Sequence, residues 1–206
     1  MSKIDEKYES LGGEAGILGA PTGVEAACAD GQGRFRDYEH GSIYSHPLSG
    51  THEIHGLIHA KWNALGRETS VLGYPKSDER DISGGIAGQY NIFQGGAITW
   101  KQGATEAFET HGAIRSKFGQ TGWESGILGF PTTDETKTPD GVGRFNHFER
   151  GSIYWKPTIS AHEVHGLIHK YWKNNGWEKN PDLGYPISKV MPNGDLNTYA
   201  QVISEG

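Results

Sequence analysis

The sequence is poor in cysteine and has no long apolar run. Its single cysteine, Cys28, cannot form an internal disulfide, so a disulfide-stapled fold is excluded and a reducing compartment or a leaderless protein is expected. The apolar runs are far shorter than the ~18 residues that a membrane-spanning helix needs, so membrane insertion is not expected. The opening residues, MSKIDEKYES, contain no apolar signal core, which predicts a cytoplasmic location or leaderless secretion.

Basic charge and enzyme motifs are also scarce. The 19 Lys and Arg residues are outnumbered by 25 Asp and Glu, for a net charge of −6, and they form no basic patch. Because phosphate binding needs such patches, nucleic acid is not an expected partner. The sequence contains no Gly-x-Ser-x-Gly elbow, phosphate loop or dinucleotide fingerprint, so an enzyme is the weaker hypothesis.

Glycine, by contrast, is abundant, and its 31 copies stand in a repeated register. Leu-Gly-aromatic-Pro occurs at 72–75, 128–131 and 183–186, with a weaker copy at 18–21, and the leucines are 54, 56 and 55 residues apart. Glu-x-His-Gly recurs at 53–56, 109–112 and 163–166, and Gly41, Gly96, Gly151 and Gly206 are each 55 residues apart. These registers predict a single domain, 1–206, of four tandem repeats at approximately 1–45, 46–100, 101–155 and 156–206.

Each repeat has the pattern of a β-hairpin followed by a helix. In GRFNHFERGSIYW, apolar residues flank a polar turn, and Gly151 is expected to supply a positive φ there. In HEIHGLIHAKWNAL, Ile54, Ile58 and Trp62 form an apolar stripe at helical spacing. The Leu-Gly-aromatic-Pro motif predicts a buried elbow between repeats, with positive φ at its glycines and an exit fixed by proline. The predicted fold class is an α+β tandem repeat of about four hairpin–helix units of ~55 residues.

These motifs resemble the LGFP repeat family, and the resemblance covers nearly the whole chain in four copies, two of them incomplete. The resemblance implies a cell-wall or glycan-binding module rather than a chemistry, since such repeats are attached to cell-wall enzymes or stand alone. The chain opens on a helix-like segment and closes on a first hairpin strand. Such complementary ends allow either closure into a pseudo-fourfold, propeller-like body or an open solenoid.

Histidines suggest an alternative function. His52, His55 and His59 are expected on one helical face, a pattern repeated further along by His162, His165 and His169, and imidazoles at this spacing can share zinc. The middle repeat has Phe108 and Arg115 at two of these positions, which leaves only Glu109 and His111. We therefore expect His55, His111 and His165 to be structural, each holding a backbone group of the adjacent hairpin, and predict neither a metal site nor a cofactor.

Recurring aromatic and polar residues of the hairpins suggest a sugar site. Aromatic faces stack on the C–H surfaces of sugars, and polar side chains orient the hydroxyl groups. The predicted carbohydrate-binding residues are Arg34, Glu39, Tyr44, Asp78, Trp100, Asp134, Arg144, Glu149, Tyr154 and Trp155. The competing interpretation is that the aromatics form core, that the Arg–Glu pairs are solvated cross-strand pairs, and that the aspartates cap turns.

We therefore expect a multivalent, lectin-like carbohydrate-binding protein without enzymatic activity. Its expected partners are glycans or cell-wall polysaccharide, and a homodimer is left open. A structural cell-wall anchoring module is the alternative, and a metal-dependent hydrolase using the His-rich segments is the third hypothesis. Ser45 stands where Trp100 and Trp155 occupy the later repeats, so the first repeat is expected to bind worst.

Overall fold

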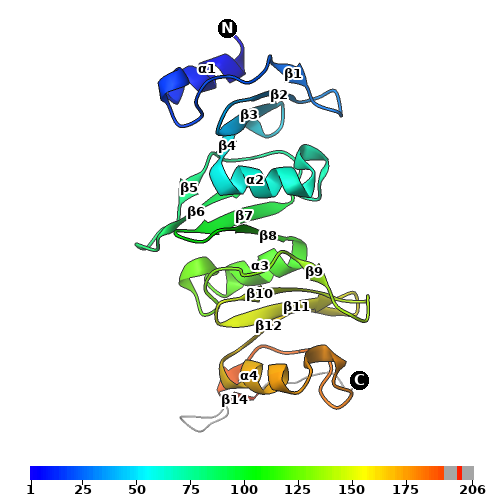
Figure 1. The fold of residues 1–206 in the computed structure, drawn as a ribbon. Coiled ribbons are helices and arrows are strands. Elements are labelled where there is room, and N and C mark those ends of the chain that lie inside the picture. The colour runs from blue at the N-terminus through cyan, green and yellow to red at the C-terminus, as the bar shows by residue number, and fades with distance from the viewer. Residues whose placement is uncertain (193–198, 201–206) are drawn as a thin grey trace. The chain divides into compact units, whose positions relative to one another are not determined.

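The computed structural model describes residues 1–192 and 199–200, which fold as α+β tandem repeats (Figure 1). The chain separates into two compact units, Met1–Glu109 and Thr110–Gly206. In the described residues there are three antiparallel four-stranded sheets and four α-helices. The prediction of an α+β tandem repeat is therefore confirmed, but with three complete repeats rather than four. The hairpin strand expected at the end of the chain, with Gly206, lies largely outside the described residues.

The first unit contains two sheets, in the strand orders β1-β2-β3-β4 and β5-β6-β7-β8. Its elements, in chain order, are α1 (Lys3–Ser10), η1 (Gly13–Ala15), β1 (Ala26–Ala27), β2 (Arg34–Asp37), β3 (Gly41–His46), β4 (Gly50–His55), α2 (Gly56–Leu65), η2 (Arg67–Thr69), β5 (Arg80–Asp81), β6 (Gly88–Ile92) and β7 (Gly96–Lys101). The last strand, β8 (Ala107–His111), contains the division between the two units.

The second unit contains the third sheet, in the order β12-β11-β10-β9, and a two-stranded ladder of β13 with β14. Its elements are α3 (Gly112–Gln120), η3 (Trp123–Ser125), β9 (Thr136–Lys137), β10 (Arg144–Phe148), β11 (Gly151–Lys156), β12 (Ile159–His165), α4 (Gly166–Asn174), η4 (Trp177–Lys179), β13 (Met191–Pro192) and β14 (Tyr199–Ala200). Helix α3 packs against β11 and β12, and α4 contacts the same two strands.

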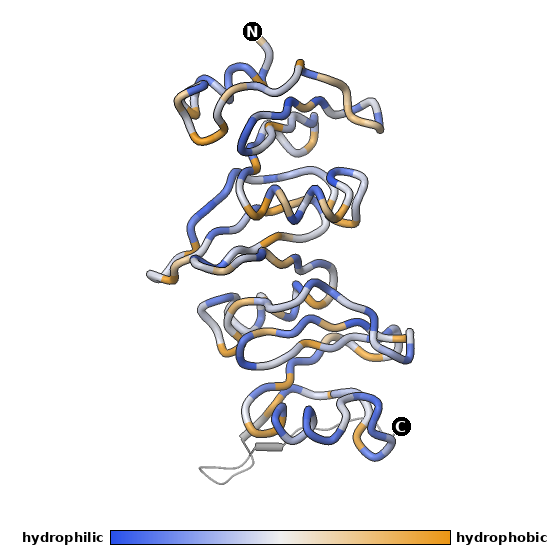
Figure 2. The backbone as a smooth tube through the Cα atoms, viewed as in Figure 1, coloured by the Kyte–Doolittle hydropathy of each residue, from blue (hydrophilic) through white to orange (hydrophobic). Residues whose placement is uncertain are grey.

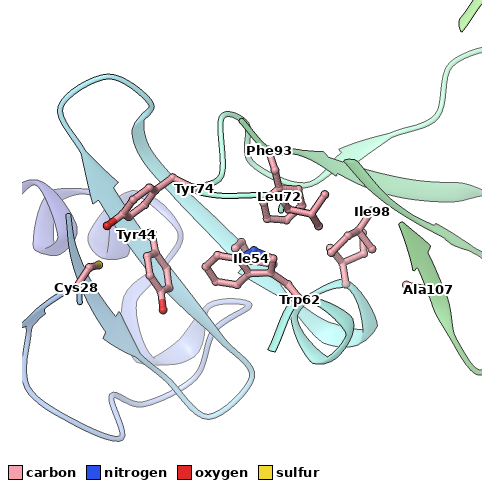
Figure 3. Close-up of a cluster of buried hydrophobic side chains, with 10 residues drawn as sticks. Cys28, Tyr44, Ile54, Trp62, Leu72, Tyr74, Phe93, Ile98 and Ala107 are labelled. Atoms are coloured by element: carbon pink, nitrogen blue, oxygen red, sulfur yellow. The ribbon is translucent and has the colours of Figure 1, made fainter. Parts of the chain in front are cut away.

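The core of the first unit forms around helix α2, which contacts β3 and β4 of one sheet and β7 of the next. Trp62 of α2 is fully buried between Tyr44 of β3 and Phe93, with ring centroids 4.7 and 5.6 Å away (Figure 3). Apolar residues recur along the helices and strands between polar ones, as an amphipathic layered fold requires (Figure 2). The elbow leucine, Leu72, joins the same core.

The junction between strand and helix corrects the predicted helix. Residues 50–55 form strand β4, paired with β3, and α2 begins only at Gly56. His55 is extended, and Gly56 has a φ of +56°, a left-handed conformation that lets the chain turn directly from strand into helix. The apolar stripe beginning at Ile54 therefore spans two elements, and the prediction that His52, His55 and His59 share one helical face is wrong.

The elbow prediction is confirmed, whereas the prediction for the hairpin glycine is wrong. Gly73, Gly129 and Gly184 have φ values of +67°, +73° and +58°. All peptide bonds in the described residues are trans, the aromatic–Pro bonds among them. Gly151 does not have a positive φ; glycine fits there because a Cβ atom would lie 2.4 Å from the carbonyl oxygen of Val164 on the neighbouring strand.

Candidate functional site

A hollow in the first unit brings together residues from four elements. It has a volume of about 310 Å³ and is lined by His55, Glu79, Gln89, Trp100 and residues 56–58 at the start of α2. Trp100 of β7 lies directly opposite Gln89 of β6 in the sheet. His55 ends β4, and Glu79 comes from the loop after the elbow. We call this feature the Trp100 hollow.

The polar side chains of the Trp100 hollow are held in a fixed network. His55 Nδ1 lies 2.7 Å from Glu53 Oε2, and its Nε2 lies 3.2 Å from Glu79 Oε1. The backbone N–H of Glu79 donates to Glu53 Oε1 at 2.8 Å. The hydrogen bond with Glu53 raises the pKa of His55. Burial raises the pKa of Glu79, the charges of Glu53 and Asp81 raise it further, and only His55 acts against them.

Trp100 also lines a second hollow of about 460 Å³, together with Asp81, Gln89, Gln102 and residues 85–88. The indole Nε1 of Trp100 donates to the carbonyl oxygen of Ala104 at 2.9 Å, and part of the ring packs against the core. Gln89 Nε2 donates to Asp81 Oδ1 at 3.3 Å. The side chain of Trp100 is thus fixed in orientation and forms part of the wall of both hollows.

The second unit repeats this arrangement, but it has a charged residue, Arg144, where the first unit has the neutral Gln89 opposite the tryptophan. His111 Nε2 lies 3.3 Å from Glu135 Oε1, and Arg144 Nε donates to the same oxygen. Trp155 lies opposite Arg144 in the ladder of β10 and β11 and packs against the buried cluster that contains Ile114 and Phe118 of α3. In the first sheet, Arg34 donates to Glu25 and lies opposite Ser45, so this copy has no tryptophan.

Four of the predicted site residues therefore form two equivalent pairs: Arg34 with Arg144, and Trp100 with Trp155. Two others are corrected. Tyr44 and Tyr154 are only 1% and 2% exposed and pack edge-on against Trp62 and Trp172, so they belong to the core. Tyr44 packs on α2 and Tyr154 on α4, and the alternation of the hairpin alone could not tell these fully buried positions from the partly buried ones of the tryptophans.

Glu39 and Glu149 bind the backbone of the elbows, and their role in sugar binding stays a prediction. Glu39 Oε2 accepts the backbone N–H of Ala20 at 3.0 Å, and Glu149 Oε2 accepts that of Phe130 at 3.3 Å. Gln94 does the same for Tyr74 in the middle repeat, at 3.2 Å. The turn of each hairpin thus holds the residue that follows the elbow glycine.

The two predicted aspartates lie in the loops after the elbows. Asp78 accepts hydrogen bonds from Lys7 Nζ at 2.5 Å and from the backbone N–H of Glu53 at 3.2 Å, and lies 3.4 Å from His52 Nδ1. These bonds tie α1, β4 and the loop together, so Asp78 is structural. Asp134 occupies the corresponding position, and its backbone oxygen accepts the hydroxyl of Thr136 at 3.0 Å.

Four histidines of the described residues have side-chain partners. His55 contacts the carboxylate of Glu79 and His111 that of Glu135, and His59 and His169 lie 2.8 and 2.9 Å from the hydroxyls of Ser42 and Ser152. In the part of the chain that the structure describes, no three His, Cys, Asp or Glu side chains are grouped so as to hold a metal ion. No helix among these residues has the length and apolarity needed to span a bilayer.

Sequence reasoning missed the pairing of His55 with Glu79 and of His111 with Glu135. A signal for it was present, since each glutamate follows its histidine by 24 residues. The third copy of the histidine, His165, is followed at that distance by Lys189, and one residue later by Val190, so the pairing ends there.

Comparison with known proteins agrees with the repeat seen in the fold. No curated protein matches the chain. The family model described as LGFP repeat matches three times, at residues 18–70, 72–126 and 128–180. Two of these matches begin at the elbow leucines Leu72 and Leu128, and the first begins at Leu18. The three matches cover well over half of the sequence, and the chain therefore belongs to the LGFP repeat family.

Proposed function

We propose that this protein is a multivalent carbohydrate-binding protein and that the Trp100 hollow is a sugar site. The observation that carries the proposal is an oriented tryptophan beside a carboxylate, an amide and an imidazole in one open hollow. Binding sites for small molecules typically combine an apolar or aromatic wall with a few well-placed polar groups. Here Trp100 offers a ring to the C–H surface of a pyranose, and Glu79 and Gln89 offer acceptors and a donor to its hydroxyl groups.

Rigidity supports this proposal, because a site that is already ordered loses less entropy on binding. Trp100 is held by its bond to Ala104, and His55 is held between Glu53 and Glu79. A sugar entering the hollow would meet side chains whose positions are set by the sheet and by the start of α2.

Repetition supports the multivalent part of the proposal. Trp155, Arg144, Glu135 and His111 form a second copy of the site in the second unit, whereas the first sheet has Ser45 in place of the tryptophan. We expect two stronger sites and one weak site. Several weak sites on one chain give avidity towards a polymer, whether the repeats close into a ring or run as an open array. A cell-wall polysaccharide is a polymer of this kind.

A glycan array tests the proposal. The wild-type protein should bind at least one class of glycan, and Trp100→Ala should bind it clearly more weakly, through loss of one of the two stronger sites, while its thermal unfolding stays close to that of the wild type. Trp123→Ala is the matched control, because Trp123 is 41% exposed and lies outside both hollows. An array on which the wild-type protein binds nothing, or on which the Trp100 and Trp123 variants bind equally well, contradicts the proposal.

A further inference from the structure

The three copies of the site differ in one charge. In the first and third sheets an arginine, Arg34 or Arg144, donates its Nε–H to the glutamate of the elbow loop, Glu25 or Glu135. The middle repeat has Gln89 at this position. The amide of Gln89 is neutral and donates to Asp81 instead, at 3.3 Å. Among the described residues, the carboxylate of Glu79 is therefore the one of the three whose ion-pair partner is a histidine, His55, and not an arginine.

The charge around Trp100 is negative as a consequence. None of the described residues lining the Trp100 hollow or the second hollow is Lys or Arg; their ionisable members are His55, Glu79 and Asp81. The charged groups that act on Glu79 are His55, Glu53 and Asp81. His55 contacts the carboxylates of Glu53 and Glu79, and Asp81 lines the second hollow, so carboxylates outnumber the one cationic side chain here.

The amino end of α2 also borders the Trp100 hollow and favours anions. Its effect equals roughly half a positive charge, which is smaller than the surplus of carboxylates. Two further features favour a cation over a neutral group at this place. An indole ring attracts a cation placed over its face, and a carboxylate binds an ammonium group by charge-assisted hydrogen bonds.

We propose, building on the sugar-binding function above, that the Trp100 hollow selects amino sugars whose amine is free and cationic, while the Trp155 site does not. The ammonium group would lie against Glu79, with the pyranose ring against Trp100. At the Trp155 site the permanently charged guanidinium of Arg144 already contacts Glu135, so the same amine meets a carboxylate that is paired with an arginine.

Titration with three tetrasaccharides of the same length tests the inference: a glucosamine tetramer, its fully N-acetylated form and a glucose tetramer. Tryptophan fluorescence and calorimetry report the affinities. We expect the glucosamine tetramer to bind about tenfold more tightly than the other two, the difference between a charge-assisted and a neutral hydrogen bond. This preference should shrink as salt rises from about 20 to about 500 mM, because salt screens exposed charges.

Two variants exchange the charge difference between the sites. Gln89→Arg should remove the preference for the free amine, so that this variant binds the glucosamine tetramer and its N-acetylated form with affinities within about twofold of each other. Arg144→Gln should give the Trp155 site the same preference, so that it binds the glucosamine tetramer about tenfold more tightly than the other two tetramers. Thermal unfolding of both variants checks that the sheets remain intact.

The outcomes separate the inference from the function on which it rests. Equal affinities for the three tetramers, with binding that still depends on Trp100, overturn the amine selectivity and leave the sugar-binding function standing. Absence of glycan binding by the wild-type protein overturns both. If an oligolysine peptide displaces the glucosamine tetramer at equal concentration, the hollow recognises amines without regard to the sugar, and the inference is wrong.

Discussion

Replacement of the elbow glycine Gly129 by alanine should destabilise the second unit by more than a positive φ alone explains. Gly129 has a φ of +73°, and a Cβ atom there would lie 2.5 Å from Glu149 Oε2 and 3.0 Å from Arg150 Nη1. The left-handed conformation costs alanine about 1 kcal/mol. Displacing Glu149 also breaks its hydrogen bond with the backbone N–H of Phe130, worth about 1–2 kcal/mol.

The free energy of unfolding should therefore fall by roughly 2–3 kcal/mol in Gly129→Ala. Gly141→Ala is the matched control, because Gly141 also has a φ of +73° but has no atom within 4 Å of the position of its added Cβ. The control should lose only about 1 kcal/mol. Urea unfolding followed by tryptophan fluorescence measures both values.

A double-mutant comparison isolates the role of Glu149. In a Glu149→Ala background, Gly129→Ala should cost no more than Gly141→Ala, since the contact and the hydrogen bond are already gone. If Gly129→Ala and Gly141→Ala are equally destabilising in the wild-type background, the elbow is not held by the hairpin turn and the assignment of Glu39, Gln94 and Glu149 to the elbows is refuted.

Two further predictions concern acid stability and the core. Burial lowers the pKa of His59 and His169 from 6.5 to about 4, so the unfolded chain binds more protons between these values. Stability should fall as the pH drops from about 6.5 towards 4, by roughly 1–3 kcal/mol for each histidine, although His55, whose pKa is raised, acts in the opposite direction. His59→Gln should flatten this slope in urea titrations, and an unchanged slope contradicts the burial argument. Trp62 is fully buried and its indole N–H has no hydrogen-bond partner among the described residues. Trp62→Ala should therefore lower the free energy of unfolding by about 3–5 kcal/mol and Trp62→Phe by clearly less, as measured by chemical unfolding. Equal losses in the two variants would show that the indole nitrogen contributes to stability.

The repeat and the elbows could be predicted because they are local and recur in register. Glycine followed by an aromatic residue and proline allows few backbone conformations, and the elbow glycines have the positive φ that was expected. The helix boundary could not be predicted from the apolar stripe. Ile54 continues the stripe of Ile58 and Trp62, and only the left-handed Gly56 divides strand from helix.

The site was harder to predict because its contacts join residues that are far apart in sequence. Trp100, Trp155 and the arginines could be recognised from their variation between repeats, and they lie at equivalent places in the sheets. Tyr44 and Tyr154 are also aromatic, and Tyr154 is the immediate neighbour of Trp155 in its strand, yet both tyrosines are fully buried. Glu39 and Glu149 contact backbone groups 19 residues earlier in the chain, which no local pattern reveals.

The most direct test of the sugar-binding account is an NMR titration of the indole N–H groups. The protein has six tryptophans, each with a separate indole signal in a ¹⁵N-labelled sample. Trp100→Phe and Trp155→Phe variants assign the two signals of interest. On addition of the glycan that binds most tightly on the array, the account predicts that the Trp100 signal shifts in proportion to occupancy and that the signals of the buried Trp62 and Trp172 stay in place. Saturable binding that leaves the Trp100 signal unmoved would contradict it.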